Sequence, residues 1–193
     1  MSIFKKLIFL NYYKNISKSY IFMGAGILPI TLNKGVIFLL LGQERHNNLL
    51  CDFGGSSNKG EKVYNTAIRE GYEELNGLLG PISELEKKVS NNLLITISYD
   101  KYTSYVFHTK YDKNLPIYFK NMNDFAEKNM PDKVNIKHNG LFEKNNIEWY
   151  KLSDYKNSKN MAKIRPHYTN ILNAIVKNEK LIIKELETKK NLY

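Results

Sequence analysis

The chain has 193 residues, which is enough to bury one hydrophobic core and short for two domains. Hydrophobic residues make up 42% of it and aromatic residues 12%, so a globular domain is expected and disorder is excluded as its main state. The single cysteine, Cys51, excludes an intramolecular disulfide and fits a reducing compartment. A net charge of +10 favours polyanionic partners such as nucleotides or RNA, although a generally Lys-rich surface and an AT-rich coding bias explain the same charge.

The chain divides into an N-terminal extension, residues 1–19, and one domain, residues 20–193. The apolar run at residues 7–10 is too short for a signal-peptide core and far below the length of a membrane span. No other run is long enough to cross a bilayer. We therefore expect a cytoplasmic protein that has no membrane partner.

Strands are expected at the front of the domain. Residues 20–31 and 36–41 are apolar runs separated by an Asn-Lys-Gly turn, and residues 49–53 lead into the Gly54-Gly55 bend. Gln43 and Arg45 follow the second run, where side chains can reach a substrate from the sheet, and a solvated residue at the end of a strand is the alternative for each.

Helices and strands are also expected behind residue 80. The predicted elements are a short helix at 82–90, a hairpin of 93–98 and 102–109, a helix at 115–128, a polar loop at 130–139, a strand at 147–152, a loop from 153 to 166 and a terminal helix at 167–189. A sheet between the terminal helix and an earlier one, at residues 63–75, predicts an α/β fold, an α/β/α sandwich with a mixed central sheet.

The predicted helix at residues 63–75 separates two kinds of side chain. At 3.6 residues per turn, Glu70, Glu73 and Glu74 share one face at i, i+3 and i+4. The other face carries apolar residues at helical spacing, as a helix packed on a sheet requires. Three converging carboxylates repel one another and suit a hard cation such as Mg²⁺ or Mn²⁺, whereas a solvated acidic face is the commoner meaning of such a pattern.

The residues before this helix favour the metal site over the solvated acidic face. Gly55 precedes Glu61 by six positions, Glu61 precedes Arg69 by eight, and the glutamates follow directly. This spacing resembles the Nudix box, Gly-x5-Glu-x7-Arg-Glu-(aliphatic)-x-Glu-Glu-x-Gly-(aliphatic). The chain departs from that pattern at three positions, where Gly71, Asn76 and Gly77 stand. All three departures concern packing or the end of the helix, where Asn and Gly can adopt the left-handed conformation, and every carboxylate is kept.

The resemblance implies a role for each matching residue. Glu70, Glu73 and Glu74, with the Gly55 carbonyl, would hold divalent cations, and Arg69 would orient the glutamates through Glu61. Gly54 would contribute to the backbone bend before the box. The activity implied is pyrophosphohydrolysis, in which a bound Mg²⁺ or Mn²⁺ neutralises the diphosphate and activates water.

Some Nudix proteins place a loop glutamate five residues before a Glu-Trp pair. Glu143 has that spacing to Glu148-Trp149, so it is the candidate fourth ligand or general base, and a surface glutamate beside a strand is the alternative. Trp149 and Phe53 are candidate stacking platforms for a base, although core packing explains either aromatic as well.

The substrate class stays open at this level. The order of the front strands is similar to Nudix members encoded by large DNA viruses and some protists, which with the basic charge makes mRNA decapping one hypothesis. Free nucleotides, dinucleoside polyphosphates and inositol pyrophosphates are others. A Nudix-fold module that binds nucleotide or RNA without turnover is the alternative to an enzyme, and many relatives pair, so a homodimer is compatible with the resemblance.

Overall fold

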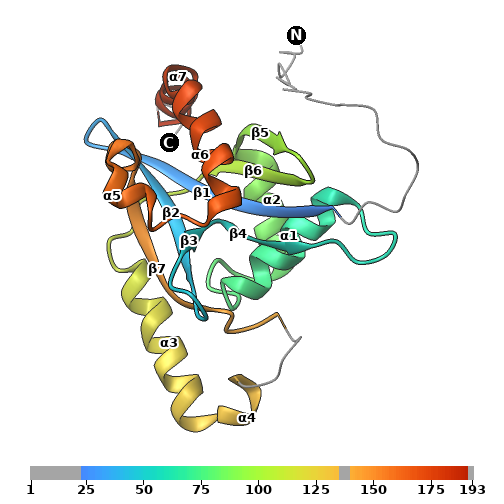
Figure 1. Ribbon diagram of the computed structural model, residues 1–193. Coiled ribbons are helices and arrows are strands. Elements are labelled where there is room, and N and C mark those ends of the chain that lie inside the picture. Colours follow the sequence, from blue (N-terminus) through green and yellow to red (C-terminus); the bar gives the residue numbers. More distant parts are fainter. Residues whose placement is uncertain (1–22, 135–139, 191–193) are drawn as a thin grey trace.

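The computed structural model describes residues 23–134 and 140–190, which fold as a mixed sheet with helices on both faces (Figure 1). The predicted extension, residues 1–19, lies outside the described residues. The α/β/α sandwich expected from the sequence is confirmed. Within the described part of the chain, no helix is both long enough and apolar enough to span a membrane.

Within residues 23–134 and 140–190, seven strands form one sheet. Along its main path the order is β3-β2-β1-β6-β5, and β4 also pairs with β1 while β7 pairs with β2. The pairing of β1 with β6 is parallel and the other pairings are antiparallel, which makes the sheet mixed. The strands are β1 (Gly24–Asn33), β2 (Val36–Glu44), β3 (Leu50–Cys51), β4 (Phe53–Ser56), β5 (Leu93–Tyr99), β6 (Tyr102–His108) and β7 (Lys144–Lys151).

Each face of the sheet buries its own hydrophobic core, because successive side chains of a strand point to opposite faces. In β1, Ala25 and Ile27 join the core beneath α1 (Val63–Glu74), α2 (Ile82–Asn92) and α3 (Leu115–Asn129). Leu28 and Ile30 join the core beneath α6 (Thr169–Lys177) and α7 (Glu179–Lys190). Figure 1 shows α6 and α7 across the sheet from α1 and α2.

The predictions for the middle of the chain are confirmed with small shifts of boundary. The helices at 63–75, 82–90 and 115–128 are α1, α2 and α3, and the hairpin is β5–β6. The predicted run 49–53 is divided between the short strands β3 and β4. The strand predicted at 147–152 begins earlier, at Lys144, because β7 stays paired with β2 back to Glu44.

Two loops and the last helix differ from prediction. The stretch predicted as a loop at 130–139 begins with the short helix α4 (Pro131–Val134), and its remainder lies outside the described residues. The loop predicted at 153–166 contains the 3-10 helix η1 (Leu152–Lys156) and α5 (Ser158–Met161). The prediction of a single terminal helix is wrong. A 3-10 turn, η2 (Pro166–Tyr168), precedes α6, and Asn178 separates α6 from α7. The side-chain amide of Asn178 donates to Ala174 O at 2.8 Å, a local hydrogen bond that competes with helix continuation.

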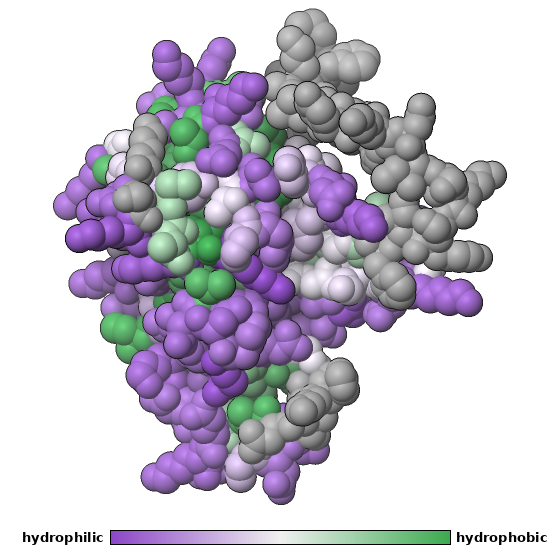
Figure 2. All heavy atoms as spheres, viewed as in Figure 1, coloured by the Kyte–Doolittle hydropathy of each residue, from purple (hydrophilic) through white to green (hydrophobic). Residues whose placement is uncertain are grey.

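The surface is mostly hydrophilic over the face that Figure 2 shows, with apolar patches between the polar side chains. Among the exposed apolar side chains are Ile117, Tyr118 and Phe125 on α3. Single exposed apolar residues are normal on soluble domains.

Helix α1 approaches the sheet unusually closely at Gly71. A Cβ added there would lie 2.5 Å from Ile27 Cγ1, and Ile27 is fully buried, so it has no room to withdraw. The aliphatic residue that the Nudix pattern has at this position is therefore incompatible with the packing of α1 on β1 in this chain.

We expect Gly71→Ala to lower the free energy of unfolding by about 1–2 kcal/mol. The added Cβ would press on a fully buried side chain, so the overpacking cost lies in the upper half of the usual range of about 1–3 kcal/mol. The gain of about 1 kcal/mol in helix propensity offsets only part of it. Asn65→Ala, at an exposed position of the same helix, is the control and should leave stability unchanged or higher. Urea denaturation of both variants decides, and equal stabilities would contradict the close packing.

Candidate active site

Arg69 is the centre of the polar face of α1. Its Nε and Nη2 each donate to a different oxygen of Glu61 at 3.0 Å, a bidentate pair. Its Nη1 lies 2.8 Å from Glu70 Oε1 and 3.0 Å from Glu73 Oε2, and Nη2 also donates to Ser56 O at 3.0 Å. The pairing of Arg69 with Glu61 that the sequence predicted is confirmed. One guanidinium thus fixes three carboxylates and the end of β4.

Glu61 is held in its charged form by this pair. Hydrogen bonds from Arg69 lower the pKa of Glu61 to about 2, with further donation from the Asn58 amide and the Thr66 hydroxyl. The pKa of Arg69 is raised, chiefly because its guanidinium donates hydrogen bonds to Glu61. Glu61 is therefore an anchor for Arg69 rather than a proton-transfer group.

Glu70 and Glu73 lie against glycines that leave room for their carboxylates. A Cβ on Gly55 would lie 2.5 Å from Glu70 Oε2, and one on Gly140 would overlap the Glu73 carboxylate. The pKa of both glutamates is raised, chiefly by burial. The positive charge of Arg69 opposes this shift, and the negative charge of the exposed Glu143 adds to it. The structure thus brings Glu143 into the same electrostatic neighbourhood as Glu70 and Glu73.

Glu74 differs from the other two glutamates because both of its carboxylate oxygens are engaged inside the protein. Oε2 accepts from the Gly54 amide at 2.7 Å, and Oε1 lies 3.0 Å from Lys144 Nζ. Glu74 is 3% exposed and Lys144 is 0% exposed. Burial raises the pKa of Glu74. Burial alone would lower the pKa of Lys144, but the neighbouring carboxylates of Glu74 and Glu44 outweigh this effect, so the pKa is raised.

The Lys144 ammonium continues into a larger buried network. Its Nζ donates to Glu44 Oε1 at 2.7 Å and to Cys51 Sγ at 3.2 Å, and Arg165 Nη1 donates to the same Glu44 oxygen at 3.0 Å. Two cations and two carboxylates balance in charge, which is what burial of such groups requires. Cys51 is part of this network, its thiol donating to Glu44 at 3.2 Å, and burial raises its pKa to about 12, so it stays a thiol.

The register of β4 on β1 bears on the predicted main-chain ligand. Gly54 lies opposite Gly26, and Gly55 lies opposite Ala25. The Gly54 amide points away from β1, to Glu74, and the amide and carbonyl of one strand residue share a side. The Gly54 carbonyl therefore faces away from β1 too, which makes it better placed than the predicted Gly55 carbonyl to meet a ligand.

Glu70 and Glu73 on α1 and Glu143 just before β7 are the residues that would hold a hard divalent cation. Glu70, Glu73 and Glu143 supply carboxylate oxygens that repel one another, and the two glycine cradles give the first two room to turn. As the side chains lie, no group of three or more His, Cys, Asp or Glu within residues 23–134 and 140–190 could hold a metal ion. Arg69 occupies the cationic position instead, so a metal has to draw Glu70 and Glu73 from Arg69, which keeps Glu61.

The predicted substrate-binding residues do not gather at one place. Phe53 is fully buried in the core, so its prediction as a stacking platform is wrong. Trp149 is half-buried, packs its ring 5.3 Å from that of Tyr111, and donates from Nε1 to Asp112 O at 2.7 Å. Gln43 donates to Asn48 O at 3.3 Å, a local contact. Aromatic residues beside a glycine bend do not reveal which face they occupy, and this ambiguity misled the sequence prediction.

Arg45 was also predicted to reach a substrate, but its guanidinium is bound to other groups of the protein. Nε donates to Phe142 O at 2.9 Å, and Nη1 forms an ion pair with Glu127 at 2.6 Å. These contacts connect the end of β2 to the loop that carries Glu143.

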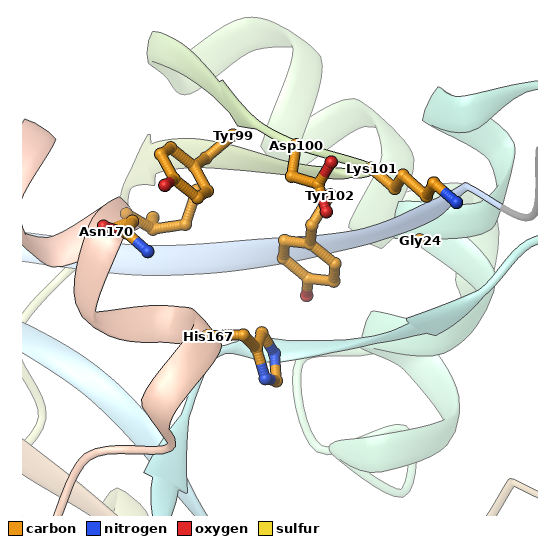
Figure 3. Close-up of a pocket in the computed structure, with 8 residues that line it drawn as sticks. Gly24, Tyr99, Asp100, Lys101, Tyr102, His167 and Asn170 are labelled. Atoms are coloured by element: carbon orange, nitrogen blue, oxygen red, sulfur yellow. The ribbon is translucent and has the colours of Figure 1, made fainter. Parts of the chain in front are cut away.

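A pocket of about 290 Å³ opens on the other face of the sheet, between the β5–β6 turn and the start of α6 (Figure 3). Tyr99, Tyr102, His167 and Asn170 line it. The Tyr102 ring lies 5.9 Å from that of His167, and its hydroxyl donates to buried Asp52 at 2.7 Å. The sequence analysis missed this pocket because its walls come from segments about 65 residues apart, which no local pattern joins.

Gly24 connects the pocket to the carboxylate side of the sheet. A Cβ added to Gly24 would lie 2.9 Å from Tyr102 Cδ2 and 3.0 Å from the Gly55 carbonyl. Gly55 in turn packs on Glu70. The pocket and the carboxylates are therefore separated by little more than the thickness of the sheet.

Solved structures show where this fold has been seen. No protein-family model matches the sequence, and no protein of curated function matches it. A bifunctional NMN adenylyltransferase/ADP ribose pyrophosphatase from Francisella tularensis, complexed with AMP and a manganese ion, matches with a TM-score of 0.53 and 16% identity, over 81% of this chain and 41% of that one. The chain thus spans about two fifths of the Francisella protein, and the likeness shows a shared fold.

Looser matches include proteins described as Nudix or as nucleotide hydrolases. The Ap4A hydrolase of C. elegans matches with a TM-score of 0.43 and 15% identity, over 90% of this chain and 100% of that one. The NUDIX domain of Shewanella oneidensis NrtR, complexed with ADP ribose, matches with a TM-score of 0.46 and 11% identity, over 86% and 94%.

Lys144 gives a direct test of the buried network. We expect Lys144→Met to lower the free energy of unfolding by about 3–5 kcal/mol, because it leaves buried carboxylates without their cation. Adding Glu74→Gln to Lys144→Met should restore part of the loss, since Glu44 keeps Arg165. Chemical denaturation of the two single variants and the double variant measures this, and a cost for Lys144→Met within about 1 kcal/mol, as for a surface pair, would contradict it.

Proposed function

We propose that this protein is a divalent-metal-dependent pyrophosphohydrolase of the Nudix type, acting on the diphosphate linkage of a nucleoside diphosphate derivative. The observation that carries the proposal is the Arg69 cluster: the residues of the box motif meet in space, with Arg69 bonded to Glu61 and paired with Glu70 and Glu73. A merely solvated acidic helix would not partly bury these pairs or hold them with one guanidinium.

The chain's own residues supply binding, orientation and proton transfer in this proposal. Glu70 and Glu73 would hold the cation, while Arg69 would release them and stay bonded to Glu61. A bound Mg²⁺ or Mn²⁺ would neutralise the diphosphate oxygens and lower the pKa of water. Glu143 accepts the proton of the attacking water, whose oxygen bonds to one phosphorus as the bridging P–O bond breaks and a phosphate-bearing group leaves.

The pocket across the sheet is a candidate binding site for a nucleobase, separate from the carboxylates. Its tyrosine and histidine rings offer stacking surfaces, and the Asn170 amide offers both a donor and an acceptor, which suits a nucleobase. The basic chain is compatible with capped RNA, so decapping stays among the substrates to test.

A binding module without turnover is the second candidate. The observation that favours it is Glu74, which the family pattern makes a metal ligand and which this chain ties to Lys144 and Gly54. Such a protein would bind nucleotide or RNA and release nothing.

Hydrolysis of a substrate panel separates the two candidates. Capped RNA, nucleoside triphosphates, ADP-ribose, diadenosine polyphosphates and inositol pyrophosphate are each incubated with Mg²⁺ or Mn²⁺, and released phosphate or nucleotide is measured. We expect EDTA-sensitive release from at least one of them. Glu73→Gln should reduce that release on the order of 100-fold or more, since it removes charge at the reacting centre.

Glu86→Gln is the matched control, since Glu86 is exposed on α2, and it should keep full activity. Binding without release across the whole panel would replace the hydrolase by the binding module. Release that Glu73→Gln leaves unchanged would contradict the proposed role of the carboxylates.

A further inference from the structure

Phe142, the residue before Glu143, has a backbone conformation that bulky residues avoid. Its φ is +61°, in the left-handed region, which is unfavourable for a side chain of this size. Such residues persist where the surrounding structure holds them, and they gather at functional sites. The question is therefore what holds Phe142 in place.

Both main-chain polar groups of Phe142 are held by side chains from other elements. Its amide donates to Asn76 Oδ1 at 2.7 Å, and its carbonyl accepts from Arg45 Nε at 2.9 Å. The Arg45 amide also donates to the Glu143 carbonyl at 3.1 Å. Two side chains, from residues just after α1 and β2, thus hold the two peptide groups on either side of Phe142.

Asn76 can grip Phe142 in only one orientation. Its Nδ2 donates to Asn123 Oδ1 at 2.9 Å, and Asn123, 2% exposed, donates from its own Nδ2 to the Lys144 carbonyl at 2.9 Å. This relay makes Asn76 Oδ1 the acceptor for the Phe142 amide and fixes the residue after Glu143 as well. Lys144 is further anchored by its buried ion pairs.

Asn76 lies in the turn that follows the carboxylate helix α1. It follows Glu73 by three residues, its amide donates to Glu73 O at 2.9 Å, and its own φ is +51°. In the Nudix pattern a glycine stands here, and glycine would make the same turn without a side chain. The asparagine of this chain therefore adds a connection between α1 and the Glu143 loop that the turn itself does not need.

We propose that Asn76 and Arg45 are positioning residues that clamp the Phe142–Glu143 backbone and so hold the Glu143 carboxylate beside the glutamates of α1. The inference rests on the proposed function, because it explains how a loop residue is kept near enough to act with a helix. A flexible loop would place Glu143 correctly for a small part of the time, and misplacement of a reacting group by about 1 Å costs on the order of 100-fold in rate.

Asn76→Gly is the variant that tests the clamp. Glycine adopts the φ of +51° readily, so the turn is kept while both side-chain hydrogen bonds are lost. Lys34→Gly, at the exposed left-handed position of the β1–β2 turn with φ +50°, is the matched control. Amide hydrogen exchange of Phe142, followed by NMR on the full chain, reports on the clamp without substrate or metal.

We expect Asn76→Gly to speed exchange of the Phe142 amide by at least about tenfold, as expected when an amide loses its hydrogen bond, and Lys34→Gly to leave it unchanged. We further expect Asn76→Gly to lower kcat about 10- to 100-fold with little change in KM. In a Glu143→Gln background it should cause no additional loss, because the clamp acts through Glu143.

The outcomes separate this inference from the proposed function. A Phe142 amide that exchanges freely in the unaltered protein, or equally in Asn76→Gly, overturns the clamp even in an active enzyme. If the Asn76→Gly, Glu143→Gln double variant loses kcat by the product of the two single losses, Asn76 does not act through Glu143. A protected Phe142 amide in a protein that hydrolyses nothing in the panel overturns the proposed function, and the catalytic purpose of the clamp with it.

Discussion

The candidate active site depends on one cation, the guanidinium of Arg69, placed among Glu61, Glu70 and Glu73. Without it, the helix face would gather like charges that repel one another and the turn before α1 would lose its anchor. Because Glu61 takes two of its donors, Arg69 can release Glu70 and Glu73 to a metal and stay in place. The packing of Gly71 on Ile27 brings this face close to β4.

A second cation, the Lys144 ammonium, performs the corresponding role inside the protein. It joins Glu74, at the end of α1, to Glu44 at the end of β2, and Arg165 completes the charge balance. Lys144 directly follows Glu143, so the buried network and the clamp on Phe142 fix the same short segment from both sides. The three glutamates of the helix are thereby divided: two face the outside of α1 and one ties the helix to the sheet.

Local patterns predicted what depends on local spacing. The helical period placed Glu70 and Glu73 on the polar face of α1, and the charge pattern paired Glu61 with Arg69. The same period placed Glu74 on that face too, and this was wrong, because the structure buries Glu74 against Gly54 and Lys144. Local patterns failed where contacts between distant segments determine which residues pair. Glu44 and Lys144 are 100 residues apart, and nothing near either indicates an ion pair. Phe53 went to the core because the β4 register, not its aromatic character, sets the face it occupies.

The proposed function requires the Arg69 cluster to open to a divalent cation. Anomalous diffraction at the manganese edge, from crystals grown with Mn²⁺, tests it most directly. The account predicts a manganese peak within about 2.1 Å of carboxylate oxygens of both Glu70 and Glu73, with Arg69 still bonded to Glu61. No manganese peak at α1, with Arg69 remaining on all three carboxylates, would contradict it.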